Sequence, residues 1–105
     1  MENARRIAIE FDFDADKSRT NVRRHGVTLE EATKLWLDTH VIVPAKNVLG
    51  ELRYAIIGRI RKKLYVAIFT ERGDKVRLIS CHRADKRWEK IYHENQKEKN
   101  EADHS

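Results

Sequence analysis

Basic and acidic side chains that could cleave RNA recur along the chain, close to the expected ends of its helices and strands. Metal-free cleavage needs a base that takes the 2′-OH proton, cations that stabilise the phosphorane, and an acid that protonates the leaving 5′-oxygen. Histidine, glutamate and arginine can supply these functions, and the candidates for catalysis are His25, Glu51, Arg53, Arg72 and Arg83. The candidates for RNA contacts are Lys17, Asn21, Arg24, Arg77 and His82.

Four of these candidates belong to one expected helix. Their spacing of i, i+4, i+7 and i+8 places them on roughly one face, and they are Lys17, Asn21, Arg24 and His25. This face could contact phosphates. It could also be a solvated face on which His25 and its basic neighbours suit the negative end of the helix dipole, and spacing alone favours this second interpretation. His25 is a better catalytic candidate than His40, because it lies in the basic run of this helix.

The remaining candidates lie on or beside strands. Glu51 and Arg53 are two residues apart, so their side chains leave the same side of a strand. They could place a base beside a phosphate-binding guanidinium, or they could form a surface ion pair that contributes little stability. Three further arginines occur in a turn, on a strand and at a strand end, namely Arg72, Arg77 and Arg83. Arginine presents a planar fork to phosphate, so the set as a whole favours anion binding.

Composition and missing motifs narrow the classes of function. The chain has 105 residues and a net charge of +5, which favours nucleic acid or an acidic partner. It contains no nucleotide-binding glycine loop, HExxH, CxxC or GxSxG motif, so we predict no cofactor and no metal site. The single cysteine, Cys81, excludes an intramolecular disulfide and fits a reducing cytoplasm. No apolar run approaches the roughly 18 residues of a membrane span, so we expect a cytoplasmic protein without membrane contact.

Local patterns predict the first half of the fold. Residues 7–13 alternate between apolar and other side chains, as in a half-buried strand. Asp14 can cap a polar helix over residues 15–24 that stops at Gly26. Thr28 and Glu31 form a capping box for a second helix. The apolar face of this helix comprises Leu29, Ala32, Leu35 and Trp36.

The second half is predicted to be a meander of strands followed by a helix. After a strand at residues 40–43, three longer strands alternate over residues 52–56, 64–69 and 76–81. The links at residues 61–62 and 71–74 are too short for a crossover, so these strands should be antiparallel. Asp85 can cap a last helix, and the residues from about Asn95 should be disordered because they are uniformly polar.

Together these elements predict an α+β fold with an N-terminal strand, two helices, a three- to four-stranded antiparallel sheet and a C-terminal helix. We expect one domain over residues 1–105, with an ordered core of about residues 6–94 and a disordered tail at 95–105. The helices should cover one face of the sheet. Arg53, Arg77 and Arg59 could then project from the free face.

Several spaced motifs are similar to a known family. The first half contains Phe11-Asp12-Phe13-Asp14, Lys17, Asn21, His25-Gly26-Val27 and Glu30-Glu31-Ala32. The second half contains Glu51-x-Arg53-Tyr54, Ile57-Gly58, Thr70-Glu71-Arg72, Arg77-Leu78-Ile79-Ser80 and Arg83-Ala84. In type and order they resemble the BrnT family of bacterial toxins, from about Phe11 to Tyr92. Phe13 stands where the family commonly has Trp, and Cys81-His82 where Ala-Arg is usual.

The resemblance implies a RelE-like toxin fold and an endoribonuclease that arrests translation. It also implies neutralisation by a cognate BrnA-type antitoxin, in a hetero-oligomer (2:2) that binds operator DNA through the antitoxin. His82 could act as an acid or base in place of the missing strand-end cation, and Asn21 and Gly58 are also candidates for structural roles.

Two other classes of function stay open at this point. A non-catalytic protein could use the same basic surface to hold nucleic acid or an acidic antitoxin without cutting RNA. Salt-sensitive RNA binding without products would identify such a protein. A dedicated DNA-binding regulator is less favoured, because the sequence shows no helix-turn-helix or basic-helix pattern for direct reading of bases.

Overall fold

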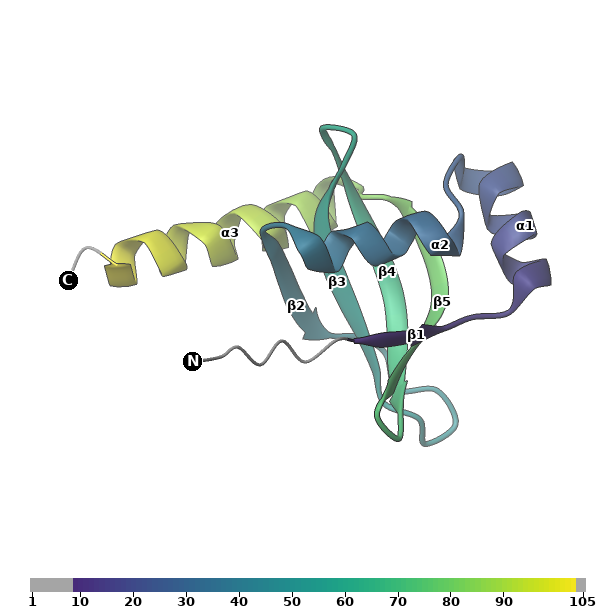
Figure 1. Cartoon of the computed structure of the whole chain (residues 1–105). Coiled ribbons are helices and arrows are strands. Elements are labelled where there is room, and N and C mark those ends of the chain that lie inside the picture. Colours follow the sequence, from purple (N-terminus) through teal and green to yellow (C-terminus); the bar gives the residue numbers. More distant parts are fainter. Residues whose placement is uncertain (1–8, 104–105) are drawn as a thin grey trace, which may run out of the picture.

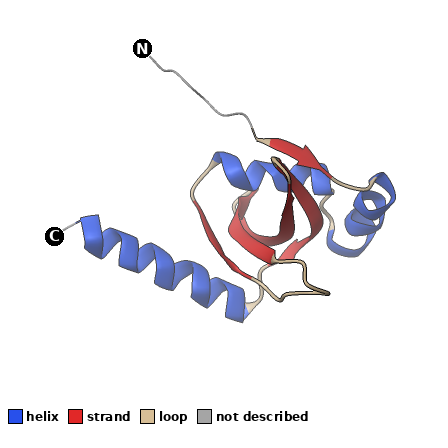
Figure 2. Ribbon diagram, turned by 90° about the horizontal axis from the view of Figure 1, so that it is seen from below, coloured by secondary structure: helices blue, strands red, loops and turns tan. Residues whose placement is uncertain are grey.

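The computed structural model describes residues 9–103, which form a five-stranded sheet with helices on both of its faces (Figure 1). The strands lie in the order β1-β5-β4-β3-β2, and in Figure 2 the sheet is strongly curved. In chain order the elements are β1 (Glu10–Asp12), α1 (Ala15–His25), α2 (Leu29–Ala32), the 3-10 helix η1 (Thr33–Leu37), β2 (His40–Pro44), β3 (Arg53–Ile60), β4 (Lys63–Arg72), β5 (Lys75–Arg83) and α3 (Lys86–Asp103).

The predicted α+β class is confirmed, but the sheet is mixed and larger than the predicted three or four antiparallel strands. Strands β2 to β5 form the expected antiparallel meander, with turns at residues 61–62 and 73–74. Strand β1 joins the sheet at its far edge, parallel to β5, with Glu10 opposite Lys75 and Asp12 opposite Arg77. The alternation of side chains predicts a strand, but it does not reveal which strand lies next to it.

Both faces of the sheet are covered, so the prediction that all helices lie on one face was wrong. One core contains Leu29 and Leu35 of α2 and η1 against Ile56 of β3. The other core places Tyr92 of α3 against the opposite face, beside Ile57 and Val66. The reason is visible in β3 and β4, where residues 55–58 and 64–67 are all buried. Strands with such continuous apolar runs need cover on both faces.

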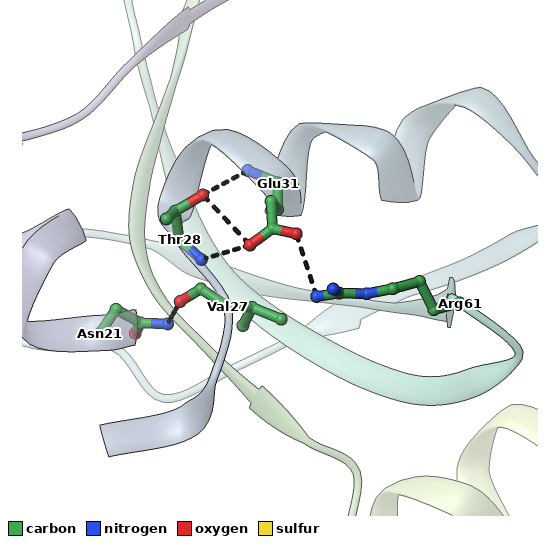
Figure 3. A network of polar contacts seen from close by, with 5 residues as sticks. All are labelled: Asn21, Val27, Thr28, Glu31 and Arg61. Carbon is green, nitrogen blue, oxygen red and sulfur yellow. Dashed lines mark hydrogen bonds and ion pairs between the residues drawn. The ribbon is translucent and has the colours of Figure 1, made fainter. Parts of the chain in front are cut away.

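The local signals at the start of α1 and α2 are confirmed. Asp14 Oδ1 accepts hydrogen bonds from the N–H groups of Asp16 (2.8 Å) and Lys17 (3.1 Å). Gly26 ends α1 with φ 76°, a conformation that suits glycine. Thr28 and Glu31 form the capping box of α2, and Glu31 also pairs with Arg61 at 3.0 Å (Figure 3). The α-helix itself is short, and η1 continues it as a 3-10 helix.

The ends of the chain differ from the prediction. Strand β1 comprises only residues 10–12, and residues 7 and 8 of the predicted strand lie outside the described residues. Asp85 caps α3 through a 3.1 Å hydrogen bond from the Trp88 N–H, as predicted. The helix then runs to Asp103 rather than ending near Asn95. Its later residues are mostly Glu, Lys and Gln, which favour helix without needing to pack in a core.

Candidate functional site

A row of polar side chains crosses four strands on the face of the sheet that carries α3. Register places Arg53 of β3 opposite Thr70 of β4, Thr70 opposite Arg77 of β5, and Arg77 opposite Asp12 of β1. Directly paired residues project from the same face, so these four side chains are neighbours. Their chain neighbours Tyr54, Phe69 and Val76 pack into the core under α2 and η1, on the other face.

Glu51 lies at the end of this row, beside two arginines. One carboxylate oxygen is 3.6 Å from Arg53 Nη2, and the other accepts a 3.3 Å hydrogen bond from Arg72 Nη2. A tight turn places Glu51 here, because Leu49 and Gly50 both have positive φ (52° and 80°), as in a type I′ turn. The N–H of Glu51 donates to Val48 O at 2.9 Å and closes the turn. The arginine cluster is defined here as Glu51, Arg53, Arg72, Arg77, Thr70 and Asp12.

The arginine cluster balances three guanidinium groups against two carboxylates. Arg77 Nη1 donates to Asp12 Oδ2 at 2.6 Å, and this hydrogen bond holds the pKa of Asp12 below its usual value. Thr70 is 2% exposed and donates its hydroxyl to Leu52 O at 2.6 Å, which ties the loop before β3 to β4. The side chains of Arg53 and Arg77 are 28% and 26% exposed. The cluster is therefore held rigidly while its arginines stay open to an anion from solvent.

One donor of the cluster is buried without a partner. Within the described part of the chain, Arg53 Nε is inaccessible to solvent and makes no hydrogen bond. A buried, unpaired N–H group costs free energy that a bound acceptor can offset. A phosphate from solvent can approach only the other atoms of the Arg53 side chain, which as a whole is 28% exposed.

Two other predicted site residues, His25 and His82, form a second group at the opposite end of β5. Arg83 follows His82 but projects from the other face, where its guanidinium carbon lies 5.8 Å from the centre of the Tyr65 ring. The rings of His25 and His82 lie 5.7 Å apart between centroids. His82 Nδ1 lies 2.9 Å from the carbonyl oxygen of Arg83, a hydrogen bond in which the carbonyl accepts. His82 lies five positions after Arg77 on β5, a span of roughly 16 Å at the rise of a strand. The predicted catalytic residues therefore do not form one site.

Three predicted RNA contacts differ in accessibility. Lys17 and Arg24 are exposed on α1. Asn21 is only 6% exposed, and its side-chain amide hydrogen-bonds the backbone of Val27 and Cys81. Asn21 therefore has the structural role that the sequence offered as the alternative to RNA contact. Among the aromatic residues of the helices, Tyr92 is 6% exposed and belongs to the core, whereas Trp36 and Trp88 are only partly buried.

Sequence reasoning missed Asp12 and Thr70 as parts of the cluster. Asp12 was treated only as a polar position of an alternating strand, because its pairing with Arg77 depends on β1 lying parallel to β5. The predicted strand ended at Phe69 and Arg72 was expected in the following turn, whereas β4 continues through Thr70 to Arg72. Alternation would have put Thr70 and Arg72 on the same face.

Two grooves flank the sheet and differ in charge. One, of about 750 Å³, lies between α3 and the segment after β2 and includes Arg53 with two further cations, Lys46 and Arg87. The other, of about 500 Å³, lies on the opposite face and is bordered by Glu71 and Asp74. Among the residues that the structure describes, no group of three or more His, Cys, Asp or Glu side chains is arranged to hold a metal ion.

The arginine cluster and the basic groove give one face of a small α+β protein an arrangement of cations that suits a polyanion. In a comparison with protein families, the model described as the ribonuclease toxin, BrnT, of a type II toxin-antitoxin system matches residues 13–87. The chain belongs to this family. It is thus a ribonuclease toxin with an antitoxin partner.

A comparison with curated proteins finds no match. None of the described helices is long and apolar enough to cross a membrane.

Proposed function

We propose that the protein is a metal-independent endoribonuclease and that the arginine cluster is its active site. The observation that carries this proposal is the pair of contacts from Glu51 to Arg53 and Arg72, with Arg77 facing them across Thr70. This arrangement provides a potential base and several charge stabilisers on one open face. RNA cleavage needs both.

The reaction follows from these positions. Glu51 takes the proton of a ribose 2′-OH, and the 2′-oxygen then forms a bond to phosphorus. Arg53, Arg72 and Arg77 stabilise the added negative charge on the phosphorane oxygens. The bond from phosphorus to the 5′-oxygen breaks, and a solvent proton completes the new 5′-OH. The products are a 2′,3′-cyclic phosphate and a 5′-hydroxyl end, and no metal ion takes part.

His25, His82 and Arg83 act on a different part of the RNA in this proposal. His82 lies roughly 16 Å along β5 from Arg77, too far to contact the same phosphate, and Lys17 and Arg24 add exposed cations on α1. We assign them to binding of the strand beyond the cleaved bond. The close imidazole pair is the one observation that favours the second group as the active site instead.

In the cell, cleavage would inhibit translation in the cytoplasm until a BrnA-type antitoxin binds. A 2:2 hetero-oligomer that contacts operator DNA through the antitoxin is part of the same proposal. Family membership supports these cellular roles.

The test is incubation of the purified protein with a defined RNA in EDTA, beside a copy with 2′-deoxy sugars. We expect cleavage of the RNA alone and 2′,3′-cyclic phosphate ends. Cleavage of the deoxy copy, or activity that EDTA abolishes, would contradict the mechanism. Salt-sensitive binding without products would instead identify a non-catalytic binding protein.

A further inference from the structure

The basic groove beside α3 opens next to the arginine cluster. Its apolar surface comes from Val43, Ile68 and Ile91, and Trp88 of α3 also lines it. Ile68 and Thr70 are two residues apart on β4, so both face this side of the sheet, roughly 7 Å apart. The groove therefore begins one step along the strand from the row that contains Arg53 and Arg77.

The charge of the groove matches a polyanion. Lys46, Arg53 and Arg87 contribute to its lining, and none of the described residues that line it is acidic. Arg53 belongs to both the groove and the cluster, and its Nε is the buried donor without a partner. A ligand that enters the groove from the cluster thus meets cations at its rim and apolar side chains within. A nucleotide has the same order of groups, a phosphate followed by a flat base.

Trp88 is the aromatic side chain that lines the groove. The guanidinium carbon of Arg87 lies 4.9 Å from the centre of the Trp88 ring, so this ring already packs against one planar group. Trp88 is partly buried against the core under α3, which fixes the ring. A fixed indole beside an arginine can stack on any base.

We propose that this groove holds the base of a nucleotide that adjoins the cleaved phosphate, with Trp88 as its stacking residue. The inference rests on the proposed function. The groove has a volume of about 750 Å³, which leaves room for a base and its sugar. Stacking would anchor the RNA so that the adjoining phosphate lies over Arg53 and Arg77.

The second groove provides an internal control. It is lined by Trp36, the other tryptophan of the chain, but its acidic neighbours Glu71 and Asp74 would repel RNA. Each tryptophan therefore reports on one groove. The W36F variant leaves Trp88 as the only indole, and the W88F variant leaves Trp36.

The experiment is a fluorescence titration of both variants with a 2′-deoxy trinucleotide, which cannot be cleaved through the 2′-OH. A matched trinucleotide lacks its central base. We expect the complete trinucleotide to quench Trp88 and leave Trp36 unchanged, and to bind about tenfold more tightly than the abasic one. If W36F does not fold, fluorine-labelled tryptophan in the unchanged sequence gives one NMR signal for each indole. The W88F variant then identifies which signal belongs to Trp88.

Equal affinity for the two trinucleotides, or no change at Trp88 at saturation, would overturn the proposal. A third outcome would also overturn the proposal. If the antitoxin quenches Trp88 and the trinucleotide does not compete with the antitoxin for this effect, the groove binds a protein partner instead. RNA cleavage by the same samples separates this proposal from the wider one. Cleavage without a response at Trp88 removes only the base site, whereas absence of cleavage removes the ribonuclease mechanism.

Discussion

The side-chain amide of Asn21 hydrogen-bonds both backbone groups of Cys81, donating to its carbonyl at 2.8 Å and accepting from its N–H at 3.1 Å. Strand β1 pairs with β5 only from Lys75 to Arg77, so this outer edge of β5 has no neighbouring strand at Cys81. Asn21 takes the place of that strand. Asn21 thereby joins α1 to the sheet. The Cys81 side chain is buried at this junction, and its burial raises the pKa of the thiol to about 12.

Replacement of Asn21 should therefore affect stability rather than RNA contact. N21A leaves the Cys81 groups and Val27 O without their partner and should lower the free energy of unfolding by about 3 kcal/mol. Urea unfolding measures this change. The matched control is N95A, because the Asn95 amide is exposed and should change stability by less than about 0.5 kcal/mol. Unchanged stability with weaker RNA binding in N21A would restore Asn21 as an RNA contact.

The two groups of candidate residues should separate kinetically. R77Q should lower kcat/KM for RNA cleavage by about 100-fold, because it removes a stabiliser of the developing charge. The H25N/H82N variant should raise KM and leave kcat nearly unchanged, because these residues bind the strand elsewhere. R23Q, an exposed change on α1, controls for the loss of one positive charge. The reverse pattern would move the active site to the imidazole pair.

A side chain at Gly58 should destabilise the protein. A Cβ atom there would lie 3.3 Å from Leu35 Cδ2 and 3.3 Å from the backbone oxygen of Thr39. Because the second contact is backbone, η1 and its following turn would have to shift. We expect G58A to lower the free energy of unfolding by about 1–2 kcal/mol. A G58A protein as stable as the parent in urea would show that this packing can relax.

Asp14 should contribute to the acid sensitivity of the fold. Hydrogen bonds from the N–H groups of Lys17 and Asp16 hold the pKa of its carboxyl below the usual 3.8. A lowered folded-state pKa gives stability that is present above the unfolded-state value and is lost as the pH falls through the folded-state value. D14N keeps the cap without this titration.

Urea unfolding across a series of pH values tests the role of Asp14. D14N should resemble the parent at neutral pH and lose less stability than the parent below about pH 4. Parallel curves for the two proteins would mean that the Asp14 carboxyl does not contribute to the acid response. Asp12, whose pKa is also lowered, remains in both proteins and cancels in the comparison.

Local signals in the sequence determined much of the fold. Asp14, Gly26 and the pair of Thr28 and Glu31 mark helix ends, since caps depend on residues within one turn. Alternation predicted β3, β4 and β5, whereas Glu51 lies before β3 and is positioned by the turn at Leu49 and Gly50. These features require only short stretches of chain, so the sequence carries them directly.

Only the tertiary structure decided which candidates share a site. The parallel pairing of β1 with β5 brings Asp12 to Arg77 across 65 positions, and the register of β5 separates Arg77 from His82. It also decided that Asn21 is buried and that α3 covers the second face. Periodicity states which side chains face the same way along one strand. It does not state which strand lies beside it, because that choice depends on packing between distant segments.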